Sequence, residues 1–179
     1  MATYLILAAS ILGADPCVSG PRVGQRPGPY SFVLSTGPER GKSHCYICET
    51  ADRPAVIVFA RSLSEPLGKL AAKIDAALAA HKASELRSWV TVLAEDQSKL
   101  DATVATWARK HALRGVPAGV FEDAEGPPSY KLHRDADVTV LLSVKQKVLA
   151  NHAFRAGELD EKAIAAIVAD VTKIVPARK

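Results

Sequence analysis

Two cysteines, Cys45 and Cys48, are the residues of this chain best suited to chemistry, and they lie in the segment "SHCYICE". Two sulfurs separated by two residues can close a disulfide, exchange electrons with another thiol pair or bind a metal. His44 precedes the pair, and a protonated imidazole at that position would lower the pKa of the Cys45 thiol. The spacing therefore leaves three roles open: a structural disulfide, a redox couple and part of a metal site.

A metal role would need more ligands than this segment contains. Zinc takes four ligands, and the two thiolates with His44 supply three of them. The fourth would come from Cys17 or from one of the remaining histidines, which are His81, His111, His133 and His152. The sequence has no second C-x-x-C and no H-x3-H spacing. We predict no metal site and no cofactor.

The elements that must position the pair follow it along the chain. The run "PAVIVFAR", residues 54–61, is continuously apolar, which predicts a strand covered on both faces. A helix is predicted from Glu65, with Ser64 as its N-cap and Pro66 in its first turn. Apolar residues at helical spacing mark its buried side, namely Leu67, Leu70, Ile74 and Leu78.

The rest of the chain alternates in the same way. Strands are predicted at 89–96 and 116–123, separated by a helix at 97–113. Two further strands, 137–144 and 147–154, form a hairpin before a closing helix at 157–175. A Gly- and Pro-rich lead-in before residue 54 contains one short strand, Tyr30 to Thr36. This order predicts an α/β domain with a parallel unit and an antiparallel edge.

The order and spacing of these segments resemble the thioredoxin fold, in the redoxin or peroxiredoxin-like branch that adds a strand before the final hairpin. The resemblance is carried by "VGQRPGPYSF", "PAVIVFARSLSEPLGKL", "VTVLAED", "VPAGVFED", "VTVLLSV" and "KVLANHAF", and it covers residues 20–175. It implies a thioredoxin-like fold with a central mixed sheet, flanking helices and an extended N-terminal lead-in. The expected divisions are a signal peptide at 1–14, the lead-in at 15–53 and the thioredoxin-like domain at 54–176.

The resemblance also implies where reacting cysteines would stand, and this chain has none there. Thioredoxins carry C-G-P-C where the first strand meets its helix, and the corresponding segment here is "SEPL". Ser64 and Leu67 replace the two cysteines, and Pro66 keeps the proline. The cis-proline that opens the hairpin strand in thioredoxins is replaced by Val138. Peroxiredoxins need P-x-x-x-[ST]-x-x-C at the same junction, and "FARSLSEPL" contains no Cys.

The placement of the pair matters because a cysteine attacks as the thiolate, which a helix N-terminus stabilises. Cys45 and Cys48 precede the first long strand, and the sequence after them, "CETADRP", predicts a loop. Contact between the pair and the helix starting near Glu65 would favour redox exchange. A position on the far side of the domain would favour a structural disulfide.

The N-terminus predicts the compartment. Residues 4–13 are apolar over the length of a signal-peptide core, although no Lys or Arg precedes them. We predict export to an extracytoplasmic location, periplasmic or secreted, with no stable membrane insertion after the signal is removed. In such an oxidising compartment Cys45 and Cys48 would form a disulfide with each other, leaving Cys17 outside it.

The composition and charge of the chain limit the classes of partner that it could bind. The chain has 179 residues and a formal net charge of +4, and its Lys and Arg residues are dispersed, so no nucleic-acid partner is expected. Two function classes remain. One is an exported redoxin-family protein that exchanges thiols and disulfides with a protein thiol partner through Cys45 and Cys48. The other is a non-catalytic thioredoxin-fold module, for binding or structure, in which the disulfide is a staple.

Overall fold

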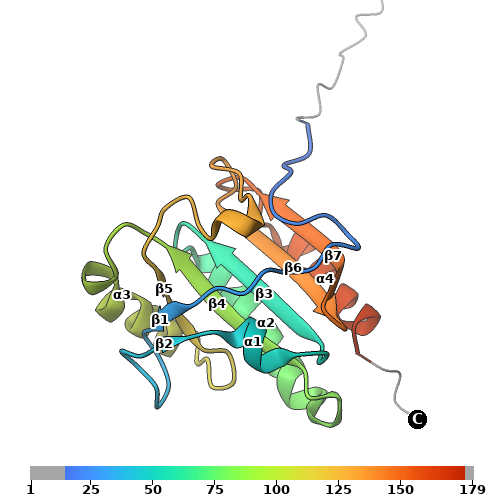
Figure 1. Ribbon diagram of the computed structural model, residues 1–179, viewed down its shortest axis with the longest axis horizontal. Coiled ribbons are helices and arrows are strands. Elements are labelled where there is room, and N and C mark those ends of the chain that lie inside the picture. The colour runs from blue at the N-terminus through green and yellow to red at the C-terminus, as the bar shows by residue number, and fades with distance from the viewer. Residues whose placement is uncertain (1–14, 176–179) are drawn as a thin grey trace, which may run out of the picture.

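A computed structural model describes residues 15–175 of the chain as one α/β domain (Figure 1). Its strands are β1 (Phe32–Leu34), β2 (Ser43–His44), β3 (Ala55–Ala60), β4 (Arg87–Leu93), β5 (Ala118–Phe121), β6 (Val138–Val144) and β7 (Lys147–Phe154). Its α-helices are α1 (Tyr46–Thr50), α2 (Glu65–Ala80), α3 (Gln97–Lys110) and α4 (Glu161–Asp170). Short 3-10 turns are η1 (Lys82–Ser84), η2 (Pro128–Tyr130) and η3 (Val171–Lys173).

All seven strands belong to one mixed sheet, in the order β2-β1-β5-β4-β3-β6-β7. Strands β3, β4 and β5 run parallel, whereas β6 is antiparallel to β3 and β7 is antiparallel to β6. From β3 onward the elements follow the order predicted from the sequence, including the extra strand β5 before the hairpin. The lead-in contributes two short strands, β1 and β2, at the far edge.

One face of the sheet carries the three long helices. Alternate residues of β3, such as Val56 and Val58, pack there in a single apolar cluster that includes Leu67 of α2, Trp107 of α3 and Ile164 of α4. Two consecutive right-handed crossovers in the same direction, β3-α2-β4 and β4-α3-β5, place α2 and α3 on the same face. Every residue of β3 is buried, which confirms the prediction of a strand covered on both faces.

The opposite face is covered by the lead-in, α1 and η2 instead of long helices (Figure 1). Its core is aromatic, and the Trp89 Nε1–H donates a hydrogen bond to the Tyr30 hydroxyl at 2.8 Å. The Tyr30 hydroxyl also lies 2.8 Å from the Thr91 hydroxyl, so the buried polar atoms satisfy one another. Burial raises the pKa of Tyr30 well above its usual range. This network fixes the lead-in on the sheet.

The turn between β6 and β7 shows how the hairpin closes without a favoured turn sequence. Lys145 and Gln146 both have positive φ, 52° and 58°, as the tight two-residue turns of hairpins require. The Gln146 amide donates to the Asp52 carboxylate at 3.0 Å, and the Lys145 N–H donates to the Asp52 carbonyl at 3.1 Å. Contacts from the loop after α1 therefore hold a turn that its own residues do not favour.

Asp75 of α2 fixes the loop that enters β5. Its Oδ1 accepts three backbone N–H groups, from Arg114 at 3.1 Å, Gly115 at 2.6 Å and Val116 at 2.9 Å. We expect Asp75→Ala to lower the free energy of unfolding by about 2 kcal/mol, because three donors lose a charged acceptor. Chemical denaturation measures the change. Asp75→Asn keeps one acceptor oxygen and should lose less; equal losses for both variants would contradict this account.

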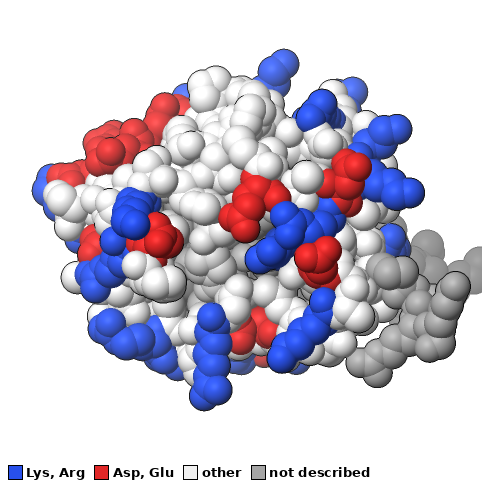
Figure 2. Space-filling model, turned by 60° about the horizontal axis from the view of Figure 1, so that its bottom comes forward, with Lys and Arg blue, Asp and Glu red and all other residues white. Residues whose placement is uncertain are grey.

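On the molecular face shown in Figure 2, Lys and Arg residues are interspersed with Asp and Glu residues. Within residues 15–175, no helix has the length and apolar character that crossing a membrane requires. The predicted signal peptide, residues 1–14, lies outside the described residues.

Candidate functional site

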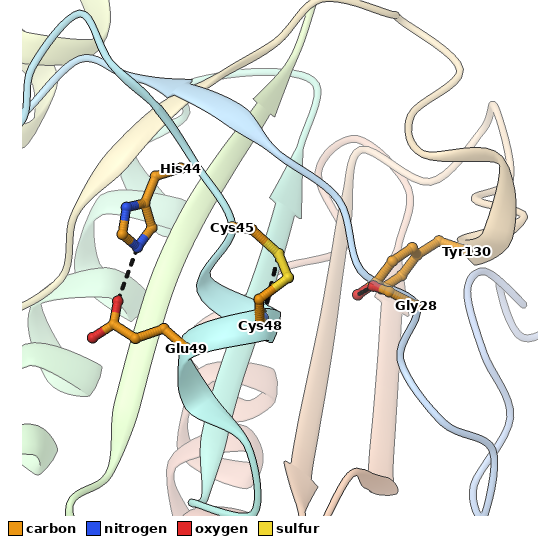
Figure 3. Close-up of a disulfide and its surroundings, with 6 residues drawn as sticks. All are labelled: Gly28, His44, Cys45, Cys48, Glu49 and Tyr130. Atoms are coloured by element: carbon orange, nitrogen blue, oxygen red, sulfur yellow. Dashed lines mark hydrogen bonds and ion pairs between the residues drawn. A yellow bond between two sulfur atoms is a disulfide. The ribbon is translucent and has the colours of Figure 1, made fainter.

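Cys45 and Cys48 form a disulfide, with their Cα atoms 5.4 Å apart, as predicted (Figure 3). The expectation of a loop over residues 48–54 holds only for 51–54, because Tyr46–Thr50 forms the short helix α1. Cys45 is the N-cap of this helix, and its Sγ accepts the Cys48 backbone N–H at 3.3 Å. No sequence pattern predicts α1, because five residues carry no helical periodicity and Cys is not among the usual capping residues.

Packing and side-chain capping hold α1 in place. The Tyr46 ring lies 5.3 Å from the Trp89 ring in a stacked arrangement, and Ile47 packs against the same aromatic cluster. At the other end of the helix, Arg53 Nε donates to the Thr50 carbonyl at 3.1 Å, and an Arg53 Nη2–H donates to the Glu49 carbonyl. A helix of five residues is not stable by itself, so these tertiary contacts position the disulfide.

The two cysteine residues differ in exposure. Cys45 is half-buried, whereas Cys48 is exposed. Cys48 borders an open groove of about 520 Å³, which we call the Cys48 groove. Its other main lining residues are Arg26, Pro27, Pro29, Ile47, Ala51 and Gln146, from the lead-in, α1 and the β6–β7 turn. A thiol in solution can therefore approach the disulfide from the Cys48 side.

The charges beside the disulfide are arranged differently from the expectation. His44 lies 2.9 Å from Glu49, measured from Nε2 to Oε2, so its ring pairs with a carboxylate rather than with Cys45 (Figure 3). The Arg87 guanidinium also lies 4.0 Å from the Glu49 carboxylate. Burial is the main cause that raises the pKa of Tyr46, with a smaller contribution from the Glu49 charge. The His44–Glu49 contact therefore joins β2 to α1.

The strand-to-helix junction where thioredoxins carry their cysteines is occupied by structural residues. The Ser64 Oγ accepts the Leu67 N–H at 3.3 Å, which confirms Ser64 as the N-cap of α2. Pro66 lies in the first turn, as predicted, and Leu67 is fully buried among the helices. Val138 begins β6 opposite Ala60 and is also buried. None of these side chains offers a thiol.

The disulfide and this junction lie on different faces of the sheet. Tyr46 and Ile47 of α1 pack against the aromatic cluster, whereas Leu67 of α2 packs in the cluster under the long helices. The end of α1 lies beside Ala55 at the start of β3, whereas Ser64 follows the end of β3. The disulfide therefore receives no help from the N-terminus of α2 and depends on its own helix.

Cys17 is free, as predicted. It is half-buried and lies beside β7 in a depression of about 420 Å³. Burial is the main cause that raises the pKa of the Cys17 thiol, opposed by the nearby Arg155 guanidinium. His152, which borders the same depression, is paired through Nε2 with Asp170 at 3.0 Å. Across residues 15–175 no three His, Cys, Asp or Glu side chains gather as a metal site would require.

Comparison with known proteins identifies the fold. No protein-family model matches the sequence, and no curated protein matches it either. A solved protein disulfide isomerase candidate from Bacteroides thetaiotaomicron is similar, with a TM-score of 0.64, 18% identity and coverage of 89% of this chain and 94% of that one.

Two further structures show the same likeness. One is a proposed thiol:disulfide interchange protein DsbE from Chlorobium tepidum, with a TM-score of 0.60, 17% identity and coverage of 84% of this chain and 98% of that one. The other is the peroxidoxin BcpB from Mycobacterium tuberculosis, with a TM-score of 0.57, 17% identity and coverage of 87% and 98%. The chain therefore has the thioredoxin fold, in the form that thiol-disulfide oxidoreductases and peroxiredoxin-like proteins share.

Proposed function

We propose that this protein exchanges thiols and disulfides with protein partners through Cys45 and Cys48, at a site displaced from the usual position in the fold. The observation that supports this most directly is the exposed residue Cys48 beside the Cys48 groove. In the forward reaction a partner dithiol is oxidised to a disulfide, and Cys45–Cys48 is reduced to two thiols. The similar solved structures include proteins described as thiol-disulfide oxidoreductases, which agrees with this chemistry.

The geometry gives the disulfide little value as a staple. Both cysteines belong to one turn of α1, so the bond joins no two elements and does not tie the lead-in to the rest of the domain. A loop closed over a separation of three residues also removes little entropy from the unfolded chain. An exposed disulfide with this small structural contribution is accessible to reduction.

The alternative is a non-catalytic module that keeps the fold for binding or structure. It is favoured by the replacement of both junction cysteines, with Ser64 serving as a cap and Leu67 as core. It is also favoured by the position of the disulfide on the face away from α2. The two functions differ in the reduction potential of the pair.

The deciding experiment is a redox titration of a Cys17→Ser variant, which carries only the pair. The protein is equilibrated in thiol-disulfide buffers, quenched with an alkylating agent and read by mass. A working exchange couple should titrate between about −270 and −120 mV, whereas a structural disulfide should lie below about −300 mV. A potential in the lower range would reject the exchange function.

Export of the protein to an oxidising compartment is part of the proposed function. The apolar segment 4–13 and a disulfide both fit an oxidising compartment, with 1–14 as signal peptide, 15–53 as lead-in and 54–176 as the thioredoxin-like domain. Mass analysis of the native protein should find a mature N-terminus near Asp15. A chain that keeps Met1 would contradict export.

We expect no peroxidase activity. Peroxide reduction in peroxiredoxins needs a cysteine at the strand-to-helix junction, and the residue at that helix start is the capping Ser64. Peroxide added with a thiol donor should disappear no faster with the protein than with a Cys45→Ser/Cys48→Ser variant. Faster consumption that requires Cys45 would overturn this prediction.

Removing the disulfide should weaken the protein without unfolding it. The entropic estimate for a fifteen-residue loop is about 3 kcal/mol, and the shorter loop between Cys45 and Cys48 should stabilise by less. Denaturation of the oxidised protein and of the Cys45→Ser/Cys48→Ser variant measures the difference. A variant that fails to fold would show that α1 depends on the bond far more than its packing indicates.

A further inference from the structure

The Cys48 groove distinguishes the two sulfurs of the disulfide. Cys48 borders the groove and is exposed, whereas Cys45 is half-buried and does not line it. The Cys45 Sγ already accepts the Cys48 N–H at 3.3 Å, a contact that would stabilise negative charge on Cys45. An entering thiolate would therefore reach Cys48. The sulfur that leaves would then be Cys45 Sγ, which already accepts a hydrogen bond from the Cys48 N–H.

The groove also has a defined charge. Arg26 lines it and is exposed, and within the described part of the chain it forms no ion pair. Lys145 and Lys147 flank Gln146, another lining residue, and both are exposed. The lead-in lies against this turn, because the Val148 N–H donates to the Gln25 carbonyl at 2.9 Å.

Two acids of the same region, Asp52 and Glu49, do not line the groove. The Asp52 carboxylate accepts the Gln146 amide at 3.0 Å, and the Glu49 carboxylate pairs with His44 at 2.9 Å. Arg26 is therefore the one charged side chain among the described residues that line the groove. Opposite charge on a partner would speed its encounter with this site.

Resting on the proposed exchange function, we infer that the partner is an acidic, cysteine-bearing polypeptide segment, and that its thiolate attacks Cys48. Pro27, Pro29 and Ile47 supply apolar walls for the residues beside the partner cysteine. Arg26 pairs with an acidic side chain of that segment.

The exchange takes place in two steps. The partner thiolate forms a bond to the Cys48 Sγ while the Cys45–Cys48 bond breaks, and Cys45 leaves as a thiolate. A second thiolate of the partner then attacks the partner sulfur of the mixed disulfide and releases Cys48. The partner loses two electrons and becomes a disulfide, and the Cys45 and Cys48 thiolates hold both electrons and take up the two protons that the partner thiols released.

The charge preference is tested with three short peptides that differ only beside one cysteine: Glu on both sides, Lys on both sides, or Gln on both sides. Each peptide is added to the oxidised Cys17→Ser protein. The rates of disulfide exchange are then divided by the concentration of peptide thiolate, so that differences in the pKa of the peptide cysteines do not affect the comparison. The Glu-to-Lys rate ratio should fall about tenfold in Arg26→Glu at low salt. The matched control is Arg22→Glu, an exposed arginine of the same lead-in outside the groove lining, which should change the ratio less than about twofold.

The attacked sulfur is identified by quenching with N-ethylmaleimide and mapping the products by mass. The expected product carries the peptide on Cys48 and the alkyl group on Cys45. Peptide found on Cys45, or a Glu-to-Lys ratio unchanged by Arg26→Glu, would overturn the inference while leaving exchange intact. Glutathione reacting as fast as the Glu peptide would overturn the polypeptide assignment. If no peptide exchanges with the disulfide, the proposed function itself fails.

Discussion

Replacing Gly119 with Ala should lower the free energy of unfolding by about 3 kcal/mol, because the added methyl group has no space between β5 and β1. A Cβ at this position would lie 2.2 Å from the Val33 carbonyl oxygen and 2.9 Å from the Leu34 Cα. These are backbone atoms of the paired strand, so no side-chain rotation relieves the overlap. The substitution must push β1 away from β5.

The same change should disturb the disulfide. Strand β1 pairs with β2, with Phe32 opposite His44, and Cys45 follows His44 directly. We expect faster amide exchange in β1 and an altered rate of Cys48 reduction, together with the loss of stability.

Gly115→Ala provides the matched control for Gly119→Ala. A Cβ at Gly115 would meet only ordinary contacts, at 3.4 Å from the Asp75 Oδ1 and 3.5 Å from the Leu78 Cδ2. Its stability should change by less than about 0.5 kcal/mol. Chemical denaturation of the unmodified protein, Gly119→Ala and Gly115→Ala provides the comparison. The free energy of unfolding should fall with denaturant at the same slope in all three. Equal losses in both variants would mean that the close approach of β1 and β5 is not the cause.

The second large effect is expected at Gly68 in α2. A Cβ there would lie 2.1–2.3 Å from three atoms of the His111 ring, at the end of α3. The His111 side chain is only 8% exposed and lies against Trp107, with ring centroids 5.5 Å apart, so it has little room to move. Gly68→Ala should therefore destabilise by about 2–3 kcal/mol, although Ala favours the helix itself.

A double-mutant cycle separates this overlap from other causes. His111→Ala in the Gly68→Ala background removes the ring that the new methyl group meets. The double variant should be more stable than Gly68→Ala alone by about 1 kcal/mol or more, because residues in contact couple strongly. Thermal or denaturant unfolding measures all four proteins. Additive effects of the two substitutions on stability would show that overlap with the His111 ring is not the cause of the loss in Gly68→Ala.

The periodic part of the fold could be predicted from sequence. Buried strands such as Ala55–Ala60 are continuously apolar, and α2 shows a helical stripe with Ser64 and Pro66 at its start, so local pattern and final structure agree. Their order predicted the thioredoxin fold, which the similar solved structures share. The pairing of Cys45 with Cys48 also followed from spacing, because the shortest ring is the easiest to close.

Only the tertiary structure determined the surroundings of that disulfide. Helix α1 exists because Tyr46 stacks on Trp89, which lies 43 residues later in β4, and because Arg53 caps its end. Arg26 and Gln146 meet at the Cys48 groove through contacts across more than one hundred residues. A local sequence pattern encodes propensity and periodicity, whereas these contacts depend on how the lead-in crosses the finished sheet. Sequence alone therefore identified the two cysteines, and the folded sheet decided which residue is the more exposed and what lies beside it.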